Sequence, residues 1–218
     1  MKAVIFDMDG LMIDSERLYF EAQREIGRRF NRQVKDEVLW KLMGRKPLES
    51  LKIFVNELDL PLSPEQAKDI RDEIMRIKMS QDLKPMPGLY HILNSLQGKL
   101  RLAVSTGAEQ EFLDIALDNL GLRDKFDVLQ ASNEINKGKP DPEIFLVTCS
   151  KLGVAPEESI ILEDSENGIK AGKAAGSYAI AIPNDYTRSH DFSEADFIAV
   201  DLFMAEHHIQ EKFGLNHS

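Results

Sequence analysis

Short apolar runs that alternate with amphipathic segments constrain the fold of this chain more than any other feature. The runs cover residues 3–8, 100–105, 126–131, 159–162 and 178–182. They show little apolar–polar alternation, which is typical of parallel strands buried on both faces. Amphipathic segments near residues 109–120, 142–152 and 166–175 have the spacing of βαβ units. The pattern predicts an α/β fold with a doubly wound parallel sheet.

One long stretch interrupts this alternation. From about residue 15 to residue 80 the sequence shows helical patterns without a buried strand, and Ser63-Pro64-Glu65-Gln66 is a capping box with proline at the first helical position. We therefore predict a core domain of residues 1–14 and 82–218 and an inserted all-helical domain of residues 15–81. The C-terminal tail also has a helical pattern.

Charge and composition narrow the classes of function. With 27 Lys and Arg against 37 Asp and Glu, the net charge is −10, which disfavours nucleic acid and anionic membranes because both bind basic surfaces. No stretch approaches the roughly 18 consecutive apolar residues of a membrane span, and the N-terminus resembles no signal peptide. The single cysteine, Cys149, cannot form an internal disulfide, which favours a reducing, cytoplasmic location. We also expect a monomer.

Two carboxylates stand at the end of the first apolar run, in the sequence Asp7-Met8-Asp9-Gly10. Ligands of open parallel sheets bind outside the carboxyl ends of the strands, so both side chains should face the functional crevice. Where the strand opens into a turn, one carboxylate can act as a nucleophile and the other as general acid and base. An ordinary turn is the alternative, because Asp and Gly favour turns.

Polar residues stand at the ends of three further strands in the same way. Ser105 and Thr106 precede a helix, whose N-terminal N–H groups favour anions. Lys139 lies in a loop just before another helix, and Glu163 and Asp164 follow a third strand. An acidic residue at such a place is either a helix N-cap or a metal ligand. Together the four strand ends supply the side chains that phosphoryl transfer with Mg²⁺ requires.

Because of these residues, the sequence resembles the haloacid dehalogenase superfamily, and within it the helical-cap phosphatases and β-phosphoglucomutase-like proteins. The motifs that carry the resemblance are residues 7–11 with 14–16, 105–106, 138–142 and 163–169. All four family motifs occur in order, and the helical insertion lies where this branch has its cap. The resemblance covers the chain to about residue 200 and implies a Rossmann-like core with an all-helical cap.

The resemblance also implies roles for individual residues. Asp7 would be the nucleophile that becomes an aspartyl phosphate. Asp9 would protonate the leaving oxygen and then deprotonate the attacking water. The phosphoryl oxygens would be held by Ser105, Thr106 and Lys139.

The resemblance further implies a Mg²⁺ ion as cofactor. Its ligands would be Asp7, the backbone carbonyl of Asp9, and Asp164, and Glu163 could reach it directly or through water. The substrate phosphate and several carboxylates would repel each other unless Mg²⁺ and Lys139 neutralise them.

The cap would determine the substrate specificity, because in the resembling proteins it closes over the site and excludes water. Arg45 and Lys46 lie in a loop between two predicted cap helices, where they could bind a second anionic group of the substrate or form a solvated pair. Glu16 and Tyr19 lie near the cap entry and could line the same cavity.

The leading hypothesis is a Mg²⁺-dependent phosphatase acting on a small phosphorylated metabolite such as a sugar phosphate. A sugar phosphomutase of the β-phosphoglucomutase type shares all four motifs, although the resembling mutases have histidine where this chain has Tyr19. A dehalogenase lacks the acid that Asp9 provides. A non-enzymatic phospho-switch related to receiver domains also pairs Asp, Ser or Thr, and Lys, but it needs no cap.

Overall fold

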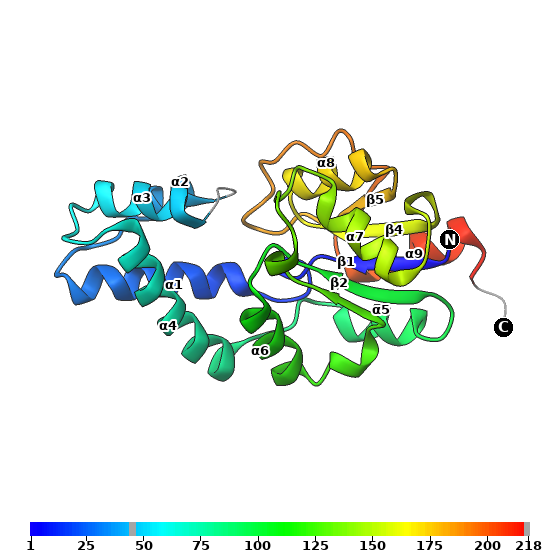
Figure 1. Cartoon of the computed structure of the whole chain (residues 1–218), viewed down its shortest axis with the longest axis horizontal. Helices are drawn as coiled ribbons and strands as arrows, with labels where there is room; N and C mark the ends of the chain where they lie inside the picture. Colours follow the sequence, from blue (N-terminus) through cyan, green and yellow to red (C-terminus); the bar gives the residue numbers. More distant parts are fainter. Residues whose placement is uncertain (44–46, 216–218) are drawn as a thin grey trace. The chain divides into compact units, whose positions relative to one another are not determined.

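The computed structural model describes residues 1–43 and 47–215, and within them the core is one six-stranded parallel sheet of order β3-β2-β1-β4-β5-β6 (Figure 1). The strands are β1 (Ala3–Phe6), β2 (Arg101–Ser105), β3 (Val128–Gln130), β4 (Ser159–Glu163), β5 (Tyr178–Ala181) and β6 (Phe197–Ile198). The order reverses between β1 and β4, as in doubly wound sheets. The predicted fold class is confirmed.

The register of the sheet aligns the carboxyl ends of its central strands. Phe6, the last residue of β1, pairs with Val104 of β2 and with Leu162 of β4. The N–H of Asp7 continues the ladder and donates to the Leu162 carbonyl at 3.0 Å. The residues that follow β1, β2 and β4 therefore emerge at one edge of the sheet, where ligands bind in this class of fold.

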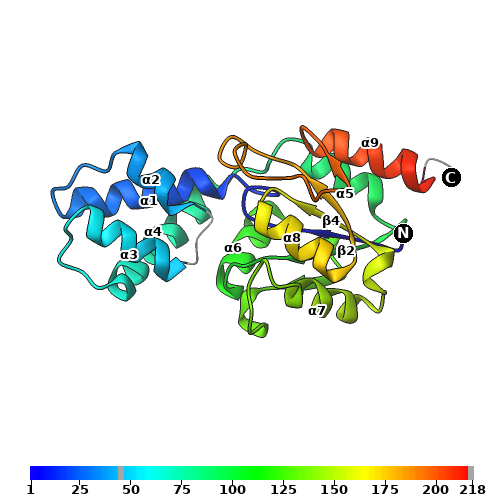
Figure 2. The same ribbon diagram turned by 90° about the horizontal axis from the view of Figure 1, so that it is seen from above.

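Helices cover both faces of the sheet, which explains its continuously apolar strands. Figure 2 shows α7 (Glu143–Leu152) and α8 (Glu166–Ala175) on one face and α5 (Leu89–Leu96) and α9 (Leu202–Phe213) on the other. A fully buried cluster that includes Ile5, Phe145 and Ile161 fills the first interface. Successive side chains of a strand point to opposite faces, so Phe6 turns away from this cluster and packs edge-on against Phe126. α6 (Gln110–Leu120) follows β2.

The chain divides into two compact units, one made of Met1–Asp14 and Lys84–Ser218 and the other of Ser15–Leu83. The described helices of the second unit are α1 (Ser15–Arg29), α2 (Asp36–Leu42), α3 (Pro47–Glu57) and α4 (Pro64–Asp82). Both α1 and α3 pack against α4. The capping box is present at the start of α4, because the Ser63 hydroxyl accepts from the Gln66 N–H and the Gln66 side chain accepts from the Ser63 N–H.

Two elements of the core unit differ from the sequence prediction, which contains neither α5 nor β6. α5 has only eight residues. It begins after Gly88, which adopts the left-handed conformation with a φ of 88°. β6 is a two-residue edge strand in which Ile198 is half exposed. β6 is too short to show a hydrophobic period, whereas α5 has apolar, buried residues at helical spacing (Leu89, Ile92, Leu93 and Leu96), a signal that the sequence prediction missed. In the part of the chain that the structure describes, no helix has the length and apolar character to cross a membrane.

Candidate active site

Asp7 and Asp9 follow β1 at the carboxyl edge of the sheet. Asp7 is buried and Asp9 is partly exposed. The turn after them requires glycine at position 10, where φ is 77° and a Cβ atom would lie 2.3 Å from the Asp164 carboxylate. The N–H of Gly10 donates to the Ile13 carbonyl at 2.9 Å and closes the turn. The glycine thus allows the loop after β1 to approach Asp164.

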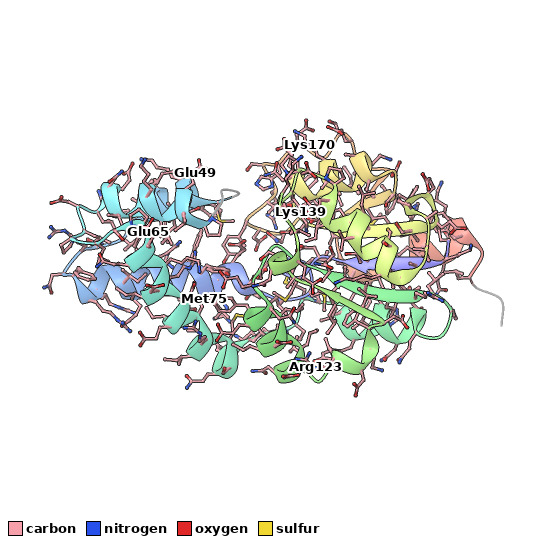
Figure 3. The ribbon with its side chains drawn as sticks, in the orientation of Figure 1. Glu49, Glu65, Met75, Arg123, Lys139 and Lys170 are labelled. Atoms are coloured by element: carbon pink, nitrogen blue, oxygen red, sulfur yellow. The ribbon has the colours of Figure 1, made fainter. Side chains whose placement is uncertain are left out.

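Lys139, on the loop before α7, supplies the positive charge of the site (Figure 3). Its Nζ donates to Asp7 Oδ1 at 2.5 Å, to Glu163 Oε1, and to the Ser105 carbonyl at 3.4 Å. Burial alone would lower the pKa of Lys139, but the carboxylates of Asp7 and Glu163 raise it above its ordinary value. Lys139 therefore remains charged and links the ends of three neighbouring strands.

Glu163 is the fully buried last residue of β4. Its Oε1 accepts from Lys139, and its Oε2 accepts from the N–H and the hydroxyl of Ser165 at 3.1 and 2.9 Å. Gly168 of α8 leaves room for this carboxylate, because a Cβ atom there would lie 1.9 Å from the Glu163 carboxyl carbon. Both oxygens have protein partners, so the geometry makes Glu163 the counter-ion of Lys139. Its ligation of a metal stays a prediction.

Asp164 is buried beside Glu163 and is held by a residue that the sequence analysis missed. Its Oδ2 accepts from Asn184 Nδ2 at 2.8 Å, and the same amide donates to the Gly10 carbonyl at 3.0 Å. Asn184 lies in the loop after β5 and belongs to none of the motifs identified above. The available signal was a polar residue shortly after a predicted strand, the same signal that identified Asp164.

Ser105 and Thr106 lie fully buried at the end of β2. The Thr106 hydroxyl donates to Asp9 Oδ2 at 3.2 Å and accepts from the Ala108 N–H at 3.0 Å. The Ser105 hydroxyl accepts from Thr148 of α7 at 3.2 Å. Thr106 is therefore the hydroxyl that contacts an acidic residue of the site, whereas the Ser105 hydroxyl bonds to α7.

The buried acidic group of Asp7, Glu163 and Asp164 has the character of a cation site, since one carboxylate oxygen from each residue lies within 4.8 Å of the other two. Burial raises the pKa of Asp7 well above its usual value, although Lys139 acts in the opposite direction. Clustered carboxylates repel each other, and their oxygens are the ligands that hard divalent cations prefer. The donor set fits such a cation, whose charge would favour the ionised form of Asp7.

The predicted substrate-contacting residues belong to the helical unit. Glu16 and Tyr19 lie in the first two turns of α1, and both are partly exposed. The Arg71 guanidinium lies 5.5 Å from the centroid of the Tyr19 ring. Arg45 and Lys46 lie outside the described residues. Contact of these four residues with a substrate stays a prediction, in contrast to the core residues above, which the fold brings together.

Comparisons with known proteins show what the chain as a whole is similar to. Residues 4–182 match the sequence model of the family described as haloacid dehalogenase-like hydrolase. A Thermotoga maritima protein named phosphorylated carbohydrates phosphatase is 36% identical over 177 residues, which cover 81% of this chain and 82% of that protein. The fructose-1-phosphate phosphatase YqaB of Escherichia coli is 30% identical, with coverage of 82% of this chain and 95% of that protein. A crystal structure from Thermotoga maritima, provisionally named a β-phosphoglucomutase, has a TM-score of 0.81 and 30% identity, with coverage of 100% of both chains.

Proposed function

The chain belongs to the haloacid dehalogenase-like hydrolase family, and on that premise we propose that it is a Mg²⁺-dependent phosphatase that hydrolyses a small sugar phosphate through an aspartyl phosphate. Its named relatives are phosphatases, so the protein is a phosphoric monoester hydrolase. The observation that carries the finer proposal is the Lys139 ammonium held between the buried carboxylates of Asp7 and Glu163.

In the proposed reaction, the Asp7 carboxylate attacks the phosphorus atom while the bond from phosphorus to the ester oxygen breaks. Asp9 gives its proton to the leaving alkoxide, which departs as the alcohol. A water molecule then gives a proton to Asp9 and attacks the aspartyl phosphate, which restores Asp7 and releases inorganic phosphate. The Thr106 hydroxyl, 3.2 Å from Asp9 Oδ2, supports the orientation of the acid.

Residues from three strand ends would bind the phosphoryl oxygens and offset their negative charge. Lys139 lies close enough to Asp7 to contact the oxygens of a phosphoryl group bound there, and Ser105 and Thr106 are the proposed hydroxyl donors. Mg²⁺, when bound, would neutralise negative charge that develops on the phosphoryl oxygens. Asp7, Asp164 and the Asp9 carbonyl would hold it, with Glu163 as a further candidate, and the buried acidic group supports this assignment.

Sugar phosphates are proposed as the substrate class because the names of two relatives specify phosphorylated carbohydrates and fructose 1-phosphate. The part of the substrate beyond the reacting phosphate would be bound by Glu16, Tyr19, Arg45 and Lys46 of the helical unit, with Arg45 and Lys46 at a second anionic group where the substrate has one. The proposal includes action as a cytoplasmic monomer, which the single buried Cys149 supports for the location.

A test of the function is phosphate release by the purified chain with Mg²⁺ from a panel of sugar, nucleotide and small-acid phosphates. We expect the highest kcat/KM for a sugar phosphate, no release in excess chelator, and no turnover by Asp7→Asn. Asp185→Asn is the matched control, because it removes an exposed carboxylate from a nearby loop. Phosphate release by Asp7→Asn at the rate of this control would refute the mechanism.

A sugar phosphomutase is the second candidate, because the structural neighbour that is provisionally named a β-phosphoglucomutase matches this chain over its whole length. A mutase must keep water away from its aspartyl phosphate until a sugar hydroxyl attacks. Tyr19, at the position where the resembling mutases have histidine, has no neutral-pH acid–base function of that kind. Incubation with β-glucose 1-phosphate and a trace of a bisphosphate should release phosphate without accumulation of glucose 6-phosphate. Rapid glucose 6-phosphate formation without free phosphate would instead assign the mutase function.

A further inference from the structure

We infer that Asn184 is a positioning residue that sets the geometry of the metal ligands, an inference that rests on the Mg²⁺-dependent function proposed above. Its side-chain amide donates to Asp164 Oδ2 at 2.8 Å and to the Gly10 carbonyl at 3.0 Å. These two acceptors are 20 and 174 residues away along the chain. One amide group therefore joins the loop after β4 to the loop after β1.

Both acceptors are directly connected to the proposed metal ligands. Asp164 is itself a proposed ligand, and Gly10 shares a peptide bond with Asp9, whose carbonyl is another. Holding the Gly10 carbonyl restricts the rotation of the backbone on which the Asp9 carbonyl lies. Holding Asp164 Oδ2 fixes the plane of the carboxylate. Groups that orient metal ligands in this way commonly determine metal affinity.

Asn184 is itself fixed from the opposite side. Its Oδ1 accepts from the N–H of Tyr186 at 2.8 Å and from the N–H and hydroxyl of Thr187 at 3.2 and 3.3 Å. The Asn184 N–H in turn donates to the Thr187 hydroxyl at 3.1 Å, and Thr187 is buried. The amide plane is thereby set by its own loop, so the two N–H bonds have fixed directions. A rigid donor can position its acceptors, whereas a mobile one would follow them.

The chemistry of an amide suits this position. An ammonium in the same place would compete with a cation for the Asp164 carboxylate, and a second carboxylate would repel it. A neutral N–H donor orients the carboxylate and leaves its charge for the metal. Asn184 also packs closely against the loop after β1, since a Cβ atom at Gly10 would lie only 2.7 Å from Asn184 Nδ2.

The test compares three variants of the full chain by calorimetric titration with Mg²⁺ alone. Asn184→Ala removes the donor, and Asn184→Leu removes it while filling the same space, so that a result is obtained even if the smaller side chain fails to fold. Asp185→Asn is the matched control, because it changes an exposed side chain of the same loop and keeps the Asn184 amide and the bonds that hold it. We expect the Asn184 variants to weaken Mg²⁺ binding by about 10–100-fold and the control to remain close to the unchanged protein.

Kinetics separate positioning from a general loss of structure. The Mg²⁺ concentration for half-maximal phosphate release should rise in the Asn184 variants, while kcat at saturating Mg²⁺ recovers and KM for the substrate is unchanged. Unchanged Mg²⁺ affinity in the folded Asn184→Leu variant would overturn the inference, and so would an equal loss in Asp185→Asn. Because the titration uses no substrate, weaker Mg²⁺ binding by the Asn184 variants supports the inference even if the chain hydrolyses no phosphoester, which would refute only the proposed function.

Discussion

Lys139 offsets the negative charge of two buried carboxylates, and replacing it should lower the stability of the folded protein. Its ammonium contacts Asp7 and Glu163, and side-chain exposure is 12% for Lys139 and 1% for Glu163. Lys139→Met keeps the aliphatic stem and leaves the carboxylates uncompensated. Breaking a buried pair in this way costs about 3–5 kcal/mol, so we expect a loss of that order in the free energy of unfolding at pH 8, measured by urea denaturation with chelator present.

The loss should shrink as the pH falls. Burial already raises the pKa of Asp7, and Lys139 is the group that lowers it. Without the ammonium, the folded-state pKa rises further above its unfolded value, so stability is retained at low pH and lost as pH rises. The deficit at pH 5 should therefore be smaller than at pH 8. Lys137→Met, in the same loop but 72% exposed, is the control. A deficit that is equal at both pH values would contradict this account.

Asp9 has a role in both halves of the proposed reaction, and the two halves can be separated by the choice of substrate. Asp9→Asn should lower kcat for a sugar phosphate by about 10²–10⁴, the usual contribution of general acid–base catalysis. An aryl phosphate needs no proton on its leaving group, so the variant should release about one equivalent of phenol rapidly and then stall. The measurement is stopped-flow detection of phenol. Steady release without a burst would place Asp9 outside the second half-reaction.

At the scale of secondary-structure elements, sequence patterns were most informative where burial is complete. β1, β2, β4 and β5 follow apolar runs because helices cover both faces of the sheet. The two-residue strand β6 gave no such signal, because a strand period needs several residue pairs to appear. α5 does have apolar residues at helical spacing, and the prediction missed them. The glycines at 121, 153 and 176 mark helix ends, because each adopts the left-handed conformation at a C-terminus, which glycine does at the least cost.

The site divides in the same way. The carboxylates, Lys139 and the hydroxyls could be predicted because each follows a strand, and parallel strands bring their carboxyl ends to one edge. Their pairing could not be predicted. That Glu163 binds Lys139 while Asp164 binds Asn184 depends on which way successive side chains turn after β4. The role of Asn184 could not be predicted, because it depends on contacts with Gly10 and Asp164, which are distant from it in the sequence.

The capping box of α4 should contribute measurably to the stability of the helical unit. The Ser63 hydroxyl accepts from the Gln66 N–H at 3.2 Å, which satisfies a backbone donor that the helix leaves free. Ser63→Ala should lower the free energy of unfolding by about 0.5–2 kcal/mol, measured by urea denaturation. Ser80→Ala on the same helix is the control, because its hydroxyl bonds to the Arg76 carbonyl one turn earlier. A loss no larger than that of the control would show that the cap contributes nothing.

The contact of α9 with the edge of the sheet should weaken in mild acid. His208 of α9 stacks on Phe197 of β6 with ring centroids 3.7 Å apart, and its Nε2 lies 3.0 Å from the Tyr178 hydroxyl. Burial, followed by the charge of Lys212, lowers the pKa of His208 from its ordinary value of 6.5. A histidine whose folded-state pKa is depressed gives its full stabilisation above the unfolded value and loses it as the pH falls below 6.5.

His208→Phe keeps an aromatic ring against Phe197 but cannot take up a proton. The difference in unfolding free energy between the unchanged protein and this variant should therefore shift in favour of the variant when the pH falls from about 7.5 to 5.5. Groups common to both proteins cancel in the difference. A difference that stays constant over this range would mean that His208 titrates alike in the folded and unfolded chains.

At the scale of the whole molecule, the helical unit is an insertion whose two ends meet in the core unit. The N–H of Asp14 donates to the Lys84 carbonyl at 3.0 Å, and Ile13 and Pro85 form an antiparallel bridge. The chain therefore leaves and re-enters the core at one place. The proposed reacting groups all belong to the core unit, whereas the proposed substrate-contacting residues belong to the insertion. Chemistry and substrate choice should be separable.

Replacing residues 15–83 with a short Gly-Ser linker tests that separation. The two strands of chain that it joins are already paired, and each unit has its own buried core, so we expect the shortened chain to unfold cooperatively and to bind Mg²⁺. It should hydrolyse an aryl phosphate but lose the preference for sugar phosphates, seen as a fall in the ratio of the two kcat/KM values. The full chain with Arg45→Ala and Lys46→Ala is the matched control, in which KM should rise for the sugar phosphate alone. If the shortened chain folds and keeps its preference for sugar phosphates, the specificity resides in the core unit. The residues that bind the sugar would then lie around the strand ends and not in the helical unit.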